Sequence, residues 1–313
     1  MMTRNDAARF LSQRNDYLIL THRRPDGDTL GSAAALCRAL RNAGKTAHVL
    51  ENPELTPRFA FLLEGLTKET AGEQDTVICV DVASPGMLPK CAEALQEKCV
   101  LRIDHHSTAT SFTPNELVDP QAGACGEIIY DLIVALGLTP DVKTAEALYV
   151  ATSTDTGCFR FSNTTDHTFR VAAACAEAGA DIYGLNQLLF ETNTLSKLRM
   201  QAWIVEHMQL FADGKMAIVA IPRAIEDLLG VTEDDMDNIS SFPRTVAGVE
   251  MAATLRQTKE GLVKISCRAV PGMDAAAVCA QFGGGGHKGA AGANLALPLE
   301  EAVKAVKEAM LGF

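Results

Sequence analysis

Short, continuously apolar segments alternate with amphipathic segments in the first third of the chain, and this alternation constrains the fold more than any other feature. The apolar segments are residues 17–21, 46–50, 76–80 and 99–103, and the helical patterns between them are residues 30–42, 57–64 and 90–97. Strands that are apolar on both sides are typical of a parallel sheet with helices on both faces. We therefore predict an α/β fold for this part of the chain.

The rest of the chain has a different pattern. Residues 124–209 are mostly helical in pattern, and residues 194–210 are predicted to form one long helix. Beyond Gly214 the pattern predicts strands and a closing helix, at residues 216–221, 251–257, 262–269 and 299–310. A chain of 313 residues corresponds to roughly two domains. We predict a parallel-sheet domain over residues 1–190, a helical linker over 191–212 and a smaller α/β domain over 213–313.

The charge of the chain bears on its partners. The net charge is −11, from 39 acidic and 28 basic residues, and the basic residues form no stripe. Proteins that bind long nucleic acids through the phosphate backbone usually carry such a stripe, because counterion release drives the binding. We therefore expect no long DNA or RNA as a partner, whereas a small anionic substrate remains compatible with the charge.

The nine cysteines indicate a reducing environment. Their number is odd, they form no Cys-x-x-Cys pair, and several lie inside apolar runs. Disulfides are therefore not expected. The N-terminus has no apolar signal region, and no apolar run is long enough to cross a bilayer. We expect a cytoplasmic protein without a membrane partner.

Three of the predicted strands run directly into residue types that bind metal ions. Residues 17–21 are followed by His22, residues 76–80 by Asp81, and residues 99–103 by Asp104-His105-His106. Because ligands of open α/β sheets bind at the carboxyl ends of the strands, these endings are expected to converge. A single Asp after a strand is often only a cap, but adjacent histidines beside a carboxylate are scarce by chance. A carboxylate in that position commonly fixes the tautomer of a metal-binding imidazole.

Two further segments add carboxylates. Asp26 and Asp28 stand in a turn made by Pro25 and Gly27, ahead of a predicted helix whose N-terminal amides favour anions. Asp155 ends a helical pattern. Taken alone, the first segment is equally compatible with a solvated loop and the second with a helix stop at Gly157.

Together these residues form a candidate centre for two metal ions. Its predicted ligands are His22, Asp26, Asp28, Asp81, His105 and Asp155. Carboxylates with some imidazole favour manganese or magnesium, and we expect manganese, with iron or zinc as alternatives. Two such ions are suited to in-line displacement at phosphorus, where strong stabilisation of charge is needed.

These motifs resemble those of the DHH phosphoesterase superfamily, named for the triplet found here as Asp104-His105-His106. The C-terminal stretch 283–292, Gly-Gly-Gly-Gly-His-Lys-Gly-Ala-Ala-Gly, resembles the glycine-rich motif of the DHH-associated domain, and Ser266-Cys267-Arg268 resembles its substrate-binding strand. The resemblance covers nearly the whole chain. In length the chain is most similar to the subfamily of oligoribonucleases (nanoRNases) that are also pAp phosphatases.

The resemblance implies a role for each residue. One metal ion would be held by His22, Asp26 and Asp81, and the other by Asp28, Asp81, His105 and Asp155, with Asp81 bridging. His106 would face the scissile phosphate, and Asp104 would orient the histidines. The implied substrate-binding residues are Ser266, Arg268, Gly284, Gly285, Gly286, His287 and Lys288. Independently, a run of glycines can form an anion-binding nest of backbone N–H groups, although a plain hairpin turn has the same composition.

Several functions therefore compete. We expect a manganese-dependent phosphoesterase that hydrolyses short oligoribonucleotides to mononucleotides and pAp to AMP, with a homodimer as a possible assembly. The alternatives are a phosphodiesterase for cyclic di-AMP or pApA and a non-catalytic nucleotide-binding regulator. An inorganic pyrophosphatase of the superfamily is disfavoured by the glycine motif, and a RecJ-type exonuclease by the length and acidity of the chain.

Overall fold

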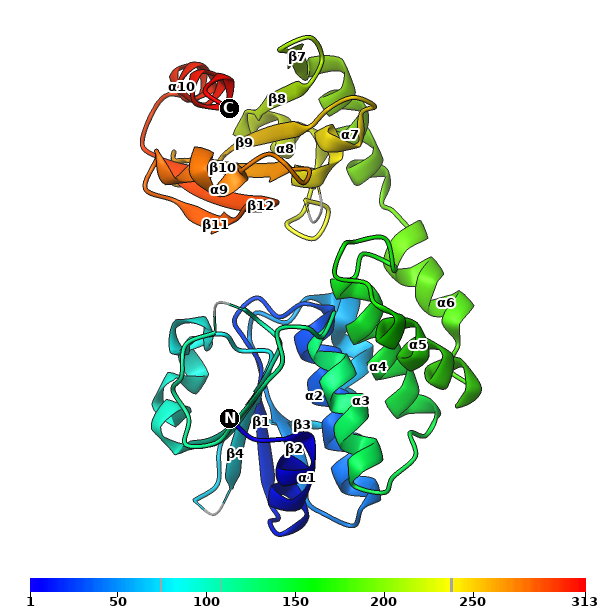
Figure 1. The fold of residues 1–313 in the computed structure, drawn as a ribbon. Coiled ribbons are helices and arrows are strands. Elements are labelled where there is room, and N and C mark those ends of the chain that lie inside the picture. The colour runs from blue at the N-terminus through cyan, green and yellow to red at the C-terminus, as the bar shows by residue number, and fades with distance from the viewer. Residues whose placement is uncertain (74, 108, 237–238) are drawn as a thin grey trace. The chain divides into compact units, whose positions relative to one another are not determined.

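The computed structural model describes residues 1–73, 75–107, 109–236 and 239–313, and these form two compact units, Met1–Thr192 and Asn193–Phe313. Each unit is built around its own sheet (Figure 1). None of the helices in the described ranges is long and apolar enough to cross a membrane.

The first unit contains a parallel sheet with strand order β3-β2-β1-β4-β5-β6. The strands are β1 (Tyr17–Leu20), β2 (Ala47–Leu50), β3 (Thr67–Lys68), β4 (Thr76–Val80), β5 (Cys99–Asp104) and β6 (Glu116–Val118). The chain moves outward in one direction from β1 to β3 and then in the other from β4 to β6. The strand order therefore reverses between β1 and β4, which is the position where such sheets bind ligands, at the carboxyl ends of the strands.

Alternate residues of these strands belong to two separate hydrophobic clusters. Tyr17 and Ile19 of β1 pack in the larger cluster, together with the helices α1 (Arg4–Ser12), α2 (Gly27–Asn42), α3 (Cys125–Ala135) and α4 (Val142–Asp155). Leu18 and Leu20 pack in the smaller cluster with the 3₁₀ segment η3 (Lys90–Lys98). This two-sided burial explains why the strands are apolar throughout. The predicted α/β fold is confirmed.

The first unit also contains further helical elements. They are η1 (Pro57–Leu63), η2 (Pro85–Met87), α5 (Asp166–Glu177), α6 (Ile182–Asn186) and one π-helical turn, η4 (Gln187–Glu191). The α-helices predicted over residues 57–64 and 90–97 are instead the 3₁₀ segments η1 and η3. Proline begins or precedes each of them and neither has a side-chain cap, so the first turns close through bonds such as Ala92 N–H to Pro89 O.

The second unit has a mixed sheet with strand order β11-β12-β10-β9-β8-β7, in which only the β8–β9 pair is parallel. Its elements are α7 (Leu195–His207), β7 (Gln209–Phe211), β8 (Met216–Ile221), α8 (Arg223–Leu229), η5 (Ile239–Thr245), β9 (Met251–Gln257), β10 (Val263–Ala269), α9 (Ala275–Ala280), β11 (Gly285–His287), β12 (Ala290–Leu295) and α10 (Leu299–Leu311). The helix predicted over residues 194–210 ends at His207, because the chain turns into strand β7.

Candidate metal centre

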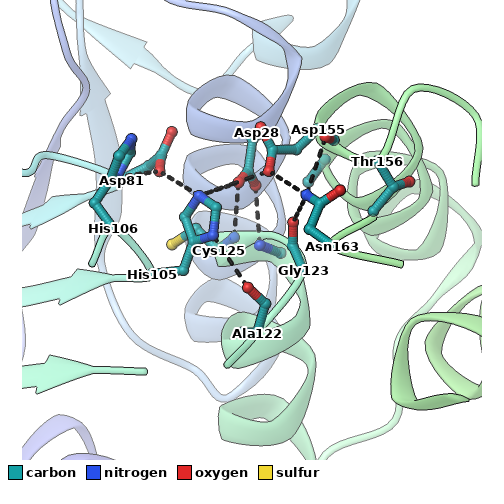
Figure 2. Close-up of polar contacts among 12 residues, drawn as sticks. Asp28, Asp81, His105, His106, Ala122, Gly123, Cys125, Asp155, Thr156 and Asn163 are labelled. Atoms are coloured by element: carbon teal, nitrogen blue, oxygen red, sulfur yellow. Dashed lines mark hydrogen bonds and ion pairs between the residues drawn. The ribbon is translucent and has the colours of Figure 1, made fainter. Parts of the chain in front are cut away.

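The site lies at the carboxyl ends of the parallel strands of the first unit. His22 follows β1 and Asp81 follows β4, so these two side chains stand on the two strands between which the strand order reverses. His105 and His106 follow β5, Asp28 lies in the first turn of α2, and Asp155 is the last residue of α4. The structure thus brings together all six residues that the sequence nominates as metal ligands (Figure 2 shows four of them).

The carboxylate of Asp81 stands between the histidines. Its Oδ2 lies 3.6 Å from His22 Nε2, and its Oδ1 lies 3.6 Å from His105 Nε2. Oδ1 is buried and has no hydrogen-bond partner among the described residues. Two donor atoms that each lie about 2.1 Å from a shared ion are separated by about 3.0 Å at octahedral angles and by about 3.4 Å at tetrahedral angles. The spacing therefore fits donors that share an ion better than it fits direct hydrogen bonds.

The other carboxylates surround the same two imidazoles. His22 Nε2 lies 3.6 Å from Asp26 Oδ1. His105 Nε2 lies 3.7 Å from both Asp28 Oδ2 and Asp155 Oδ2. Three groups have donor atoms within 4.8 Å of one another: His22, Asp26 and Asp81; Asp28, His105 and Asp155; and Asp81, His105 and His106. This set of oxygen and imidazole donors suits a divalent transition metal or magnesium.

The tautomers of His22 and His105 are set by backbone carbonyls. Nδ1 of His22 lies 2.7 Å from the carbonyl oxygen of Arg23, and Nδ1 of His105 lies 3.2 Å from that of Ala122. With Nδ1–H donating to a carbonyl, Nε2 keeps its lone pair and faces the carboxylates, as a metal ligand requires.

His106 is held differently. Its Nδ1 lies 2.8 Å from Asp104 Oδ1, and the same oxygen accepts the backbone N–H groups of His105 and His106. This hydrogen bond to Asp104 raises the pKa of His106 to about 9. A protonated His106, partly exposed, can donate to an anion at the rim of the site.

The carboxylates of the centre repel one another when no cation is present. Burial, together with the charges of Asp81 and Asp155, raises the pKa of Asp28 well above its usual value. Burial also raises the pKa of Asp155 to about 6. Burial by itself would lower the pKa of His22, but the facing carboxylates of Asp26 and Asp81 raise it to about 11. A cation would remove this repulsion, so the donor set fits a bound metal ion.

Sequence reasoning overlooked a segment that directly holds two of the candidate ligands, Asp28 and His105. The backbone N–H groups of Cys125 and Gly126 donate to the carboxylate of Asp28 at 2.7 and 2.9 Å. The carbonyl oxygen of Ala122 accepts from His105, and that of Gly123 accepts from the Asn163 side chain (Figure 2). The segment Ala122–Gly126 thus acts through its backbone, which leaves no signature in the residue types.

Asn163 is a second residue that the sequence analysis missed. Its Nδ2 donates to the carbonyl oxygen of Gly123 at 2.8 Å, and it lies 3.3 Å from Asp155 Oδ2. It therefore ties the Asp155 carboxylate to the segment Ala122–Gly126. No motif marks it, since it follows Asp155 by eight positions in an ordinary polar stretch.

Arg102 is a third part of the site that the sequence analysis missed. Arg102 in β5 is fully buried and donates to the carbonyl oxygens of Ala83 and Thr110 at 3.0 and 2.9 Å. Its guanidinium lies 3.8 Å from Asp104 Oδ2. It therefore fixes the segments that follow β4 and β5 and places a positive charge beside Asp104.

The residues predicted to bind substrate lie in the second unit. Ser266 and Arg268 belong to β10, and Gly285, Gly286 and His287 form the edge strand β11. Arg268 and His287 are both paired with Ala290 of β12, so their side chains share one face of the sheet. Lys288 is exposed in the turn between β11 and β12.

The first glycines of the run 283–286 use their backbone N–H groups within the protein, so these groups do not form an open anion-binding nest. The N–H groups of Gly283 and Gly284 donate to the carbonyl oxygens of Ala280 and Cys279, at the end of α9. A Cβ on Gly284 would lie 2.2 Å from the carbonyl oxygen of Gly292, so close backbone packing requires glycine there. In the part of the chain that the structure describes, the later glycines Gly285 and Gly286 lie in the edge strand, whose outer edge is unpaired and can bind a ligand.

Comparison with known proteins gives consistent matches along the chain. Residues 16–152 match the sequence profile of the DHH family N-terminal domain, and residues 215–312 match that of the DHHA1 domain. The bifunctional oligoribonuclease and PAP phosphatase NrnA of Thermus thermophilus is 34% identical over 300 residues, which cover 93% of this chain and 88% of the relative.

Two other matches extend this comparison. The cyclic-di-AMP phosphodiesterase PdeA of Listeria monocytogenes is 24% identical over 301 residues, which cover 88% of this chain and 44% of that protein. The crystal structure of an exopolyphosphatase-related protein from Bacteroides fragilis superposes with a TM-score of 0.87 at 23% identity, covering 99% of this chain and 96% of that one. At this identity the structural match shows the fold alone.

Proposed function

The chain belongs to the DHH family of phosphoesterases, and on this basis we propose that it hydrolyses short oligoribonucleotides to mononucleotides and pAp to AMP, using two divalent metal ions, with manganese preferred. The Thermus relative supports this substrate class, since it is named an oligoribonuclease and PAP phosphatase and is similar over nearly its whole length. The observation that carries the proposal is the position of the Asp81 carboxylate, with one oxygen toward His22 and the other toward His105.

The proposed ligand sets follow the groups of donors in the structure. His22, Asp26 and Asp81 form one group and would hold one ion. Asp28, His105 and Asp155 form another and would hold the second ion together with Asp81, whose Oδ1 lies 3.6 Å from His105 Nε2, so that Asp81 would bridge. When bound, a pair of such ions stabilises negative charge at phosphorus and lowers the pKa of a coordinated water. The oxygen-rich donor set favours manganese over zinc.

One residue of this chain, His106, is proposed to act on the substrate's phosphate, and Asp104 and Arg102 are proposed to hold it in position. Protonated His106 would donate from its Nε2 to the scissile phosphate, and its Nδ1 is held by Asp104. Arg102, buried beside Asp104, would keep that carboxylate in place. Fixed donors of this kind stabilise developing charge without having to reorganise during the reaction.

The second unit is proposed to bind a further part of the substrate. Arg268 and His287 share a sheet face next to the free edge of β11, and the edge glycines allow close approach of an anion. Ser266 and Lys288 would add polar donors. We propose residues 1–190 as the catalytic domain, 191–212 as the linker and 213–313 as the substrate-binding domain.

A phosphodiesterase for cyclic di-AMP or pApA is the second candidate function. It is supported by the similarity to the Listeria protein named a cyclic-di-AMP phosphodiesterase, although this chain matches less than half of that protein's length. A non-catalytic nucleotide-binding regulator is disfavoured by the complete set of donors.

The deciding experiment is a side-by-side assay of short RNA, pAp and cyclic di-AMP with manganese present and after treatment with a chelator. We expect hydrolysis of short RNA and pAp to exceed that of cyclic di-AMP, and chelation to abolish it. Full activity after chelation would contradict the metal-dependent mechanism, and a clear preference for cyclic di-AMP would favour the second candidate.

A variant of the second unit tests the proposed division of roles. Arg268→Ala or His287→Ala should weaken turnover of RNA of two to five nucleotides and of pAp, because each removes a donor from the proposed binding face. Hydrolysis of bis-p-nitrophenyl phosphate should suffer much less, since that ester needs mainly the metal centre. Equal losses on both kinds of substrate, or a preference for long RNA, would contradict the division.

A further inference from the structure

The turn that follows Asp155 has an unusual backbone. Gly157, Cys158 and Phe159 all have left-handed φ values, of 58°, 57° and 61°. This conformation is disfavoured for residues other than glycine, and consecutive examples are rare. Strained backbone of this kind persists only where the surrounding structure enforces it, and it is concentrated at functional sites.

Hydrogen bonds fix this turn. The N–H of Cys158 donates to the carbonyl oxygen of Ser153 at 2.7 Å, and the N–H groups of Arg160 and Phe161 both donate to that of Thr156 at 3.0 Å. The ring of Phe159 anchors the turn by packing near the rings of Tyr149 and Phe169, with centroids 5.8 and 5.6 Å away. The chain therefore folds back on itself, and Arg160 and Phe161 return toward the end of α4.

Arg160 presents a guanidinium that is only partly engaged. Its Nε donates to the carbonyl oxygen of Gly157 at 2.6 Å, and its other guanidinium nitrogens have no partner within the described ranges. The side chain is exposed, in a chain whose net charge is −11. A fixed guanidinium with free N–H groups matches the geometry of a phosphate.

The next residue, Phe161, places its aromatic ring against Gly157, whose carbonyl oxygen accepts from Arg160. A Cβ on Gly157 would lie 2.3 Å from a ring carbon of Phe161, so the ring packs directly over this glycine. Even so, 52% of Phe161 remains exposed. An aromatic ring that is held in position and exposed on one side is the usual platform on which a base stacks.

We propose that Arg160 and Phe161 form a nucleotide-binding element beside the metal centre, in which Arg160 binds a phosphate adjacent to the scissile one and Phe161 stacks on a base. Gly157 is two residues from Asp155, so their Cα atoms are at most about 7 Å apart, a distance that one nucleotide spans. This inference rests on the proposed function and narrows it to substrates that carry both a base and a second phosphate.

The first test removes the guanidinium. Arg160→Ala should raise KM for pAp and for the dinucleotide pApA about tenfold, as expected for the loss of a charge-assisted contact. Arg160→Lys should recover only part of this loss, because an ammonium cannot reproduce the paired contacts. Arg170→Ala, which removes another exposed arginine from α5, is the matched control and should leave KM unchanged.

The second test pairs a change in the protein with a change in the substrate. Phe161→Leu keeps an apolar cover over Gly157 but removes the ring face, and should raise KM for pApA by about five- to tenfold. Phe161→Tyr should retain the wild-type KM. With pApA analogues in which one or the other base is replaced by hydrogen, the penalty of Phe161→Leu should fall below about twofold for one of the two.

The outcomes separate this inference from the proposed function. A wild-type protein that hydrolyses neither short RNA nor pAp overturns the proposed function and, with it, this inference. A wild-type protein that hydrolyses them while Arg160→Ala and Phe161→Leu keep the wild-type KM overturns the inference alone, as does a Phe161→Leu penalty that is equal with both abasic analogues. Melting temperatures of the full-length variants identify any loss that reflects unfolding.

Discussion

At the scale of single residues, the geometry of the metal centre depends on backbone conformations and hydrogen bonds that orient the candidate ligands. Asp81 sits at a left-handed backbone position (φ 57°), and its N–H donates to the carbonyl oxygen of Ile103 at 2.8 Å. This conformation directs the carboxylate between His22 and His105, where one of its oxygens has no hydrogen-bond partner in the described part of the chain. Burying a carboxylate oxygen without a partner costs free energy unless a cation is bound, so this residue is the main support for the proposed metal site.

Asp81→Asn should therefore cost more activity than a change at any other proposed ligand, because a bridging carboxylate serves both ions. Loss of one charge-stabilising group typically lowers kcat about 10²- to 10³-fold, and loss of a bridge should lower it at least as much. Steady-state kinetics at saturating manganese measures this. A kcat comparable to that of the wild type, with metal bound, would rule out the bridging role.

Asn163→Ala should weaken metal binding rather than abolish it. The amide of Asn163 holds the Asp155 carboxylate, and loss of such an outer partner typically lowers metal affinity about 10- to 100-fold. Calorimetric titration of manganese into the protein measures the change directly. Asn42→Ala is a matched control, since Asn42 also donates to a carboxylate, that of Asp141 at the start of α4. The same loss of affinity in both variants would contradict a specific role for Asn163.

At the scale of elements, the position of the ligands is set by how closely two helices pack. Helix α2 carries Asp28 in its first turn and α4 carries Asp155 at its end. Between the helices, a Cβ on Gly31 would lie 2.4 Å from the carbonyl oxygen of Ala147, which only backbone movement could relieve. The spacing of the two carboxylates therefore depends on a glycine that is not itself a candidate ligand.

Gly31→Ala should destabilise the fold by about 1–3 kcal/mol, the usual cost of overpacking, and should also weaken manganese binding by separating α2 from α4. Denaturant unfolding and metal titration measure the two effects. Gly86→Ala is the control, because a Cβ there meets no atom of the described residues within 4 Å and the backbone needs no left-handed angle. Unchanged stability in Gly31→Ala would show that the helices adjust without cost.

The same scale shows what the sequence could and could not predict. The strands of the first sheet that are buried on both faces were predictable because this burial makes them apolar throughout, as in β1 and β4. Strand β12 was not predicted although it has 6 residues, because it consists mostly of alanine and glycine. Strands β3 and β7 escaped prediction because they are only 2 and 3 residues long and have no apolar alternation. The convergence of the candidate ligands followed from strand endings, whereas the segment Ala122–Gly126 acts through backbone atoms that every residue type shares.

At the scale of the whole molecule, the metal centre couples stability to pH. Burial raises the pKa of Asp155 from its usual value near 3.8 to about 6, and that of Asp28 also rises well above the usual value. A carboxyl group whose pKa is higher in the folded state binds protons more tightly there, so it contributes stability at low pH that is lost as the pH rises through the folded pKa. The raised pKa of His106, about 9, acts in the same direction.

Manganese should therefore stabilise the protein more at pH 8 than at pH 5, because metal binding requires deprotonated carboxylates. The positive charge of the ion also relieves the repulsion among these carboxylates. Melting temperatures of the chelator-treated and manganese-loaded protein at the two pH values test this. An equal shift at both values would mean that the groups of the centre do not titrate in this range.

The backbone hydrogen bonds that hold Asp28 also affect how the sequences of family members should be compared. Its carboxylate accepts from the amides of Cys125 and Gly126, and an amide donates in the same way beneath any side chain except proline. Position 125 can therefore change to another small residue that fits the buried site of Cys125 without loss of the contact, whereas position 126 is restricted to glycine by its approach to Ala151. Alignments that score side-chain identity would rank position 125 as dispensable although its main chain holds a candidate ligand. A scan with proline, rather than alanine, would reveal such positions.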